Sequence, residues 1–184
     1  MTLFLIVILV VIVLAVIVGI AMYNGLIAQR NRVENAWAQI DVQLKQRYDL
    51  IPNLVETVKG YAAHERATLD AVISARNQGM SASTPHEQAE AENQITGALR
   101  QLFALSEAYP DLKANDQFLN LQEQLTAIEG KVAYARQFYN DTVYKYNTSI
   151  QKFPQVIFAR MLSFTEREYF EADDDTRGPV HVKF

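Results

Sequence analysis

The stretch LFLIVILVVIVLAVIVGIAM, which covers residues 3–22, decides how the fold begins. Its twenty residues include no charged and no polar side chain. At about 1.5 Å per helical residue, a helix of this length spans roughly 30 Å, the thickness of the hydrocarbon core of a bilayer. The sequence therefore predicts that residues 1–22 form a transmembrane anchor.

A secretory signal peptide is the alternative interpretation of the same segment. A signal peptide has a positively charged start and an apolar core of about 7 to 15 residues. Met1 and Thr2 carry no Lys or Arg, and the apolar core is longer, which favours a retained anchor. Gly19 and Ala21 nevertheless have the spacing of small residues that a signal peptidase prefers, so cleavage stays open.

The Lys and Arg residues near the anchor predict its orientation. None precedes it, whereas Arg30, Arg32 and Lys45 follow it. Since the flank richer in Lys and Arg stays in the cytoplasm, residues 23–184 are expected there, with the N-terminus outside. The formal net charge of −4 at pH 7 argues against a general attraction to nucleic acid.

Beyond the anchor, apolar residues recur at steps of three and four, which is the period of a packed helix. We predict one helix from the membrane to about Asn77, interrupted only at Pro52. Inside a helix, proline cannot donate to the carbonyl four residues back, here that of Tyr48, which costs about 3 kcal/mol or more. We therefore predict a kink or break within a few residues of Pro52, with the Tyr48 carbonyl bonded near residues 109–116 or to water.

Two more helices are predicted after a loop near Gly79. Thr84, Pro85 and Glu87 have the pattern of a helix start, with an N-cap, a proline at the first helical position and a capping box. This helix is expected to end near Ala108. The third helix is expected over residues 118–153.

Together these segments predict an all-α fold. A single N-terminal transmembrane helix continues into an elongated antiparallel three-helix bundle with up-down-up order, followed by a short helical or irregular tail. The predicted domains are the anchor, a membrane-proximal helical stalk, the helical bundle and the C-terminal tail. Their respective ranges are 1–22, 23–51, 52–153 and 154–184.

Four stretches carry a resemblance to a known family. They are NRVENAWAQIDVQLKQRYDLIPNLVETVKGYAAHE, LSEAYPDLKANDQFLNLQEQL, YARQFYNDTVYKYNTSIQKFP and YFEAD, which begin at residues 31, 105, 134 and 169. In this order and spacing, the chain resembles the LemA family of bacterial membrane-anchored proteins. The segment QVIFARMLSF, residues 155–164, departs from a family pattern that is more often small and aliphatic.

The resemblance implies a helical domain behind one N-terminal membrane helix, with a short outer N-terminus, in the bacterial inner membrane. It implies no established activity and supplies no catalytic residue. Genes of the family often lie near those of membrane peptidases, which makes such a peptidase a candidate partner.

The sequence offers no catalytic, cofactor or metal site. A di-metal site in a helical bundle needs Glu-x-x-His motifs, and none of the three His residues follows a Glu at that spacing. His86 and Glu90 lie one turn apart and could hold a metal weakly, although solvent-facing positions are the simpler interpretation. There is no Cys, and no Ser lies in a nucleophile motif. We expect neither an enzyme nor a cofactor.

Two asparagines could set the register of a bundle. Tyr139-Asn140 and Tyr146-Asn147 recur seven residues apart. An asparagine at a helical seam can fix register and oligomeric state. Plain exposed positions explain the same spacing equally well.

A length argument points to self-association. The first helix beyond the anchor would be about 80 Å long and the second only about 36 Å, so the second would cover the first only to about residue 54. An apolar stripe nearer the membrane would stay uncovered and would form an oligomer interface. This stripe consists of Val33, Trp37, Ile40 and Leu44.

The expected function is that of a non-enzymatic scaffold that self-assembles at the cytoplasmic face of the bacterial inner membrane. The alternative is an adaptor or accessory module for another membrane protein, such as a membrane peptidase. The expected partners are the lipid bilayer, further copies of the chain and a membrane protein, and they do not include nucleic acid.

Overall fold

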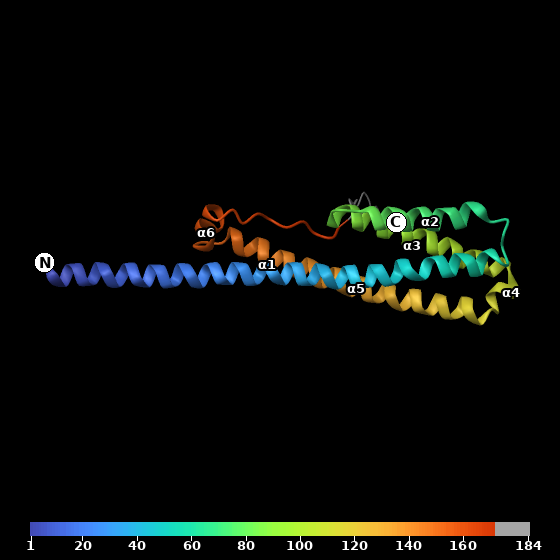
Figure 1. Cartoon of the computed structure of the whole chain (residues 1–184), viewed down its shortest axis with the longest axis horizontal. Helices are drawn as coiled ribbons and strands as arrows, with labels where there is room; N and C mark the ends of the chain where they lie inside the picture. The colour runs from blue at the N-terminus through green and yellow to red at the C-terminus, as the bar shows by residue number, and fades with distance from the viewer. Residues whose placement is uncertain (172–184) are drawn as a thin grey trace, which may run out of the picture. The chain divides into compact units, whose positions relative to one another are not determined.

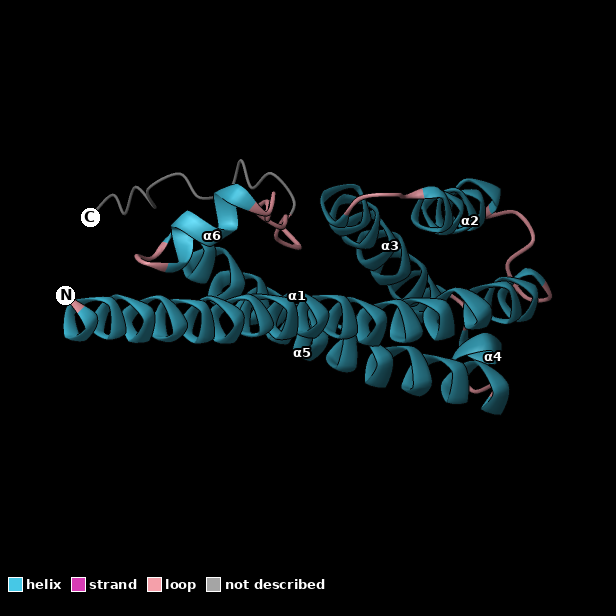
Figure 2. Ribbon diagram, turned by 60° about the vertical axis from the view of Figure 1, so that its left-hand side comes forward, coloured by secondary structure: helices cyan, strands magenta, loops and turns pink. Residues whose placement is uncertain are grey.

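The computed structural model describes residues 1–171, and every regular element in that range is helical (Figures 1 and 2). This confirms the all-α prediction; the end of the predicted tail, residues 172–184, lies outside the described range. The elements are α1 (Thr2–Lys59), α2 (Arg66–Ser81), α3 (Pro85–Leu105), the 3₁₀ turn η1 (Ser106–Ala108), α4 (Pro110–Lys113), α5 (Asp116–Gln151) and α6 (Gln155–Met161).

Helix α1 is one continuous helix of 58 residues that begins in the apolar stretch. All side chains of residues 2–18 are exposed, although most are Leu, Ile or Val. Among the described residues, α1 alone is long and apolar enough to cross a membrane. Exposed apolar side chains along such a length fit a lipid environment.

The first helix ends earlier than predicted, and it does not break at Pro52. We expected it to reach about Asn77, but α1 passes through Pro52 and ends at Lys59. Gly60 follows, and the amide of Ala62 bonds the carbonyl of Val58 at 2.9 Å to close the turn. Glycine is a poor helix former, which weakens the helix at this point. A bend at Pro52 stays a prediction.

The tolerance of Pro52 has a local cause in α2. Arg76 Nε donates to the carbonyl oxygen of Tyr48 at 2.8 Å. That carbonyl is the one that Pro52 leaves without a helical donor. We expected its partner near residues 109–116 or in water, and that expectation is wrong. The guanidinium group supplies the missing hydrogen bond, so the helix continues.

The chain divides into two compact units, which we describe separately. Among the described residues, unit 1 combines residues 1–39 with 137–167, and unit 2 combines residues 40–136 with 168–171. The division into anchor, stalk, bundle and tail is a different partition, and it stays a prediction.

In unit 2, α2 and α3 form an antiparallel hairpin (Figure 1). The predicted start of α3 is confirmed: Thr84 Oγ1 accepts from the Glu87 amide at 3.2 Å, and the Glu87 carboxylate accepts from the Thr84 amide at 3.2 Å. Helix α3 ends at Leu105, where the 3₁₀ turn η1 follows. Helix α5 is capped by Asn115, whose Oδ1 accepts from the Phe118 amide at 2.9 Å.

In unit 1, the end of α5 packs against α1. The rings of Trp37 and Tyr139 lie 5.4 Å apart, and Val33 is only 3% exposed. In unit 2, Ile40 and Leu44 are 0% and 2% exposed. The prediction of an uncovered stripe is therefore wrong, because the length argument considered cover by the second predicted helix alone. We place no oligomer interface on these four residues.

Candidate functional site

A buried group of polar side chains lies inside unit 2, between α1 and α3. It consists of Arg47, Tyr48, Gln88, Glu92 and Thr96, which we call the polar cluster. The α3 members are spaced four residues apart, which places them on one face of that helix. Arg47 and Glu92 are each only 2% exposed. A charged pair at this depth requires full pairing, because an unpaired buried charge is strongly destabilising.

Hydrogen bonds satisfy both oxygens of the Glu92 carboxylate. Arg47 Nη1 donates to one of them at 2.7 Å, and the Tyr48 hydroxyl donates to the other. The second terminal nitrogen of Arg47 donates to Thr96 Oγ1 at 2.9 Å. Gln88 Nε2 donates to the Tyr48 hydroxyl at 2.6 Å. The network joins the two helices, and within it Arg47 Nε is buried without a hydrogen-bond partner.

Electrostatics keep the tyrosine of the cluster protonated. Burial raises the pKa of Tyr48 far above its ordinary value, and the charge of Glu92 and the hydrogen bond to Glu92 raise it further. Tyr48 therefore remains a neutral donor throughout the physiological pH range. The Glu92 carboxylate thus accepts one hydrogen bond from the neutral Tyr48 hydroxyl and one from the Arg47 guanidinium, whose positive charge balances its own.

A second arginine lies near the same carboxylate. Burial lowers the pKa of Arg136, and the charges of Glu92 and Glu171 oppose that shift. Its guanidinium lies 4.8 Å from the ring centroid of Phe170, which is 0% exposed. This cation–π contact brings α5 and the segment after Glu168 to the cluster.

Helix α2 approaches the cluster closely at a glycine. A Cβ atom added at Gly79 would lie 2.5 Å from the hydroxyl oxygen of Tyr48 and 3.2 Å from Ile95 Cδ1. Glycine is therefore required here by packing. The sequence predicted a loop near Gly79. In the structure, Gly79 lies within α2, at the point where this helix contacts Tyr48.

The polar cluster is suited to holding helices together. Both carboxylate oxygens are engaged, and the tyrosine is fixed in its protonated form, so neither group is placed to transfer a proton to a substrate. Within residues 1–171, no group of three or more His, Cys, Asp or Glu side chains could hold a metal ion. The geometry indicates a structural element.

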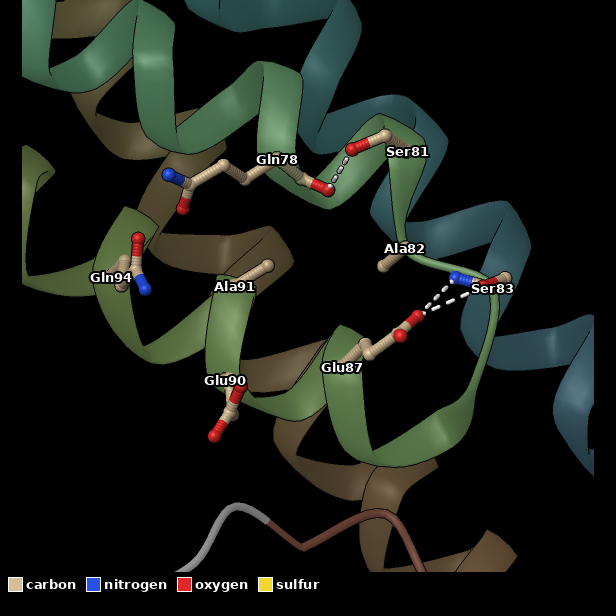
Figure 3. A pocket seen from close by; sticks show the side chains of 8 residues that line it. All are labelled: Gln78, Ser81, Ala82, Ser83, Glu87, Glu90, Ala91 and Gln94. Atoms are coloured by element: carbon tan, nitrogen blue, oxygen red, sulfur yellow. Dashed lines mark hydrogen bonds between the residues drawn. The ribbon is translucent and has the colours of Figure 1, made fainter.

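A polar hollow of about 310 Å³ lies at the turn between α2 and α3 (Figure 3). Figure 3 shows the Glu87 carboxylate directed at Ser83, whose amide and hydroxyl donate to it at 2.8 and 2.9 Å. The Ser83 amide is the largest cause that lowers the pKa of Glu87. Because this carboxylate caps the helix as an anion, Glu87 is not placed to act as an acid in the hollow, which Glu90 also lines.

His86 takes part in structural contacts. Its Nδ1 donates to the backbone carbonyl of Glu171 at 2.8 Å, and its Nε2 lies 3.6 Å from Glu90 Oε1. His86 and Glu90, which the sequence places one turn apart, thus lie close together in α3. The histidine also fastens the segment after Glu168 within unit 2.

Of the two candidate register residues, Asn147 acts inside unit 1. It is 7% exposed, its Nδ2 donates to the Arg167 carbonyl at 2.9 Å, and its Oδ1 accepts from the Arg167 amide at 2.9 Å. Asn147 therefore holds the segment after α6 against α5. Asn140 is half-buried, and its role in register stays a prediction.

The model of the LemA family matches residues 36–184, a range that includes the whole polar cluster and begins after the apolar segment. The chain belongs to the LemA family. Protein LemA of Metamycoplasma hominis is 26% identical, over 85% of this chain and 72% of its own length. Magnetosome protein MamQ 2 of Paramagnetospirillum magneticum is 25% identical over 86% of this chain and 68% of its own length. MamQ of Magnetospirillum gryphiswaldense is 22% identical over the same shares.

Family membership and the exposed apolar part of α1 indicate a LemA-type, membrane-associated protein that is anchored through its N-terminal helix. The matched range contains Arg47, Tyr48 and Glu92. The family region thus contains the polar cluster, and the apolar segment precedes it.

Proposed function

We propose that this LemA protein is a non-enzymatic scaffold that holds a helical core at the cytoplasmic face of the bacterial inner membrane. The observation that carries the proposal is the continuity of α1. One helix leads from the apolar segment to the buried pair of Arg47 and Glu92 without a break. Helix α1 carries both the apolar segment and part of the polar cluster. This arrangement suits a scaffold protein that is anchored in a membrane and binds other proteins beside it.

The polar cluster supports a structural function over a catalytic one. A buried ion pair contributes little net stability compared with apolar packing, but it can specify a unique arrangement of helices. Arg47 reaches Glu92 and Thr96 with two separate nitrogens. A shift of α3 by one residue would break both bonds, so the cluster favours a single register.

The cytoplasmic orientation rests on Arg30 and Arg32, which follow the apolar segment closely. Because the chain contains no Cys, one introduced thiol reports on topology without background. Met80→Cys places it on an exposed side chain of unit 2. A membrane-impermeant maleimide should label this variant only after cells are opened, and labelling of intact cells in which the outer membrane is permeable would reverse the orientation.

Self-assembly is the second part of the proposal. The four residues first considered for the interface are largely buried within the chain, so assembly would use other exposed side chains. Tyr134 of α5, for example, is 73% exposed. Native mass spectrometry of the full chain in mild detergent tests this part. A defined homo-oligomer supports the scaffold, whereas a monomer at every concentration would favour an adaptor for another membrane protein.

A further inference from the structure

The segment around α6 lies beside the apolar part of α1 in unit 1. A Cβ atom added at Gly19 would lie 3.3 Å from Cε1 of the Phe158 ring, so the ring packs directly on this glycine. Gly19 lies three residues inside the apolar stretch that ends at Met22, which is about 5 Å along a helix. Figure 1 shows α6 beside α1 at this level. The α6 segment therefore lies at the edge of the expected hydrocarbon region.

Contacts on the inner side of α6 fix it at this level. Ala159 is buried, and the Phe164 amide donates to its carbonyl at 2.9 Å. The Phe164 ring lies 6.2 Å from that of Tyr23, and the Arg30 guanidinium lies 5.7 Å from its centroid. Because Tyr23 and Arg30 belong to α1, the height of the segment is set by the anchor helix.

The outer side of the segment exposes large apolar side chains. Phe153 is 79% exposed and Met161 is 74% exposed. Ile157, midway between them, is 48% exposed, as is Leu162. Ile157 and Met161 lie four residues apart in α6 and so share one face of that helix, whereas Phe153 lies in the turn before it. Two basic residues, Lys152 and Arg160, are exposed in the same segment.

An apolar hollow of about 310 Å³ adjoins the segment. On the α1 side it is lined by Val18, Ala21 and Met22, which belong to the apolar stretch. Gln155 of α6 lines the other side. Gln29 and Ser149 also line the hollow, and its apolar part has the chemistry that an acyl chain requires.

We propose that residues 152–162 form a second membrane contact, which inserts into the interface of the bilayer that holds α1. The exposed apolar side chains enter the boundary between headgroups and acyl chains, and Lys152 and Arg160 bind anionic headgroups. Interfacial segments of this kind bury their apolar face about 5–10 Å into that boundary, which agrees with the level of Gly19. Lipid is the occupant because a surface fixed at the height of the apolar stretch faces lipid wherever the chain itself does not cover it. The inference goes beyond the proposed scaffold and requires only that α1 spans a bilayer.

Spin labels on single cysteines test the proposal in the full chain, reconstituted in vesicles of phosphatidylethanolamine and phosphatidylglycerol. Power saturation compares collisions with oxygen, which concentrates in lipid, and with a water-soluble nickel chelate. Met161→Cys is the test position. Leu9→Cys is the control inside the anchor, and Met80→Cys is the control on an exposed methionine of unit 2, 58% exposed.

The proposal predicts that the label at position 161 collides more often with oxygen than with nickel, as at position 9, while the order reverses at position 80. If the label at position 161 collided more often with nickel than with oxygen, as at position 80, the proposal would be overturned. A label shielded from both reagents would indicate a protein cover and would also overturn it. Circular dichroism of each labelled variant checks that the helices are intact.

The basic residues give an independent readout. Lys152→Gln with Arg160→Gln should make the label at position 161 shallower in vesicles that contain phosphatidylglycerol, and should leave it unchanged in vesicles of phosphatidylcholine alone. An equal depth in both lipids for the parent and the double variant would remove the assignment to anionic headgroups.

Discussion

Helix α1 exposes apolar side chains in its first 17 residues and buries a charged side chain at Arg47. The first part exposes almost only apolar side chains, whereas Arg47, a charged residue, is 2% exposed. A protein in water alone would arrange these residues in the reverse way. The two parts therefore suit different surroundings: the apolar side chains of the first fit lipid, and the chain itself supplies a complementary acid for the second.

The largest effect is expected from removing that acid. Glu92→Ala leaves the Arg47 guanidinium buried without its carboxylate, which should lower the free energy of unfolding by about 3–5 kcal/mol. For a chain of this size the loss corresponds to a fall of roughly 10 °C in Tm. Thermal unfolding followed by circular dichroism in detergent measures it.

Glu123→Ala is the matched control for this prediction, because Glu123 is an exposed acid on α5. Its replacement should change the free energy of unfolding by no more than about 0.5 kcal/mol. Equal stability of the two variants would mean that Glu92 does not stabilise the buried Arg47 guanidinium.

The next prediction compares two leucines of α1. Leu44 is 2% exposed and Leu9 is 61% exposed. Leu44→Ala should lower the free energy of unfolding by about 2–5 kcal/mol, since it opens a cavity in the core. Leu9→Ala should leave unfolding of the core in detergent nearly unchanged, because its side chain is largely exposed among residues 1–171. Similar losses in the two variants would break the comparison.

A smaller loss is expected at the closest approach of α2. Gly79→Ala places a methyl group against the Tyr48 hydroxyl and should lower the free energy of unfolding by about 1–3 kcal/mol. Gly97→Ala is the control, because a Cβ there meets nothing within 4 Å. The control should be neutral or stabilising by up to about 1 kcal/mol, since alanine is the better helix former. A stabilised Gly79→Ala would contradict the packing of Gly79 on Tyr48.

The smallest effect concerns Pro52 and its substitute donor. Arg76→Ala should lower the free energy of unfolding by about 1–2 kcal/mol, because the Tyr48 carbonyl loses its hydrogen bond to the Arg76 guanidinium. In a Pro52→Ala background, the new amide can bond this carbonyl within α1, so the same change should matter less. A double-mutant cycle from urea unfolding measures the coupling. Strict additivity would contradict the role assigned to Arg76.

The local features of the fold were predictable from the sequence. The apolar run, the capping box of Thr84 and Glu87 and the start of α5 each depend on a few neighbouring residues. The end of α1 was not predicted, because Tyr61, Ala62 and Ala63 after Gly60 do not strongly oppose a helix. The continuity through Pro52 depends on Arg76, 24 residues further on, and no local pattern reports that contact.

The polar cluster was missed for a similar reason. Gln88, Glu92 and Thr96 lie four residues apart, as on an ordinary solvated helix face. Glu92 directly follows the buried Ala91, and Ile95 lies one turn further on. Two features of the sequence could have indicated the polar cluster. One is the polar stripe beside the apolar face of α3, and the other is Arg47 within the apolar stripe of α1. Their meaning depended on the pairing of the two helices.

The central claim is that the chain itself covers α1 beyond the anchor, so that lipid surrounds only the beginning of the helix. The most direct test is the rate of maleimide labelling of Leu44→Cys in the full chain, compared with Val42→Cys, whose parent side chain is 52% exposed. We predict slow labelling at position 44 and fast labelling at position 42 at every protein concentration, including those at which the protein is monomeric. Labelling at position 44 that becomes as fast as at position 42 upon dilution would show that other copies provide the cover, and would contradict the account.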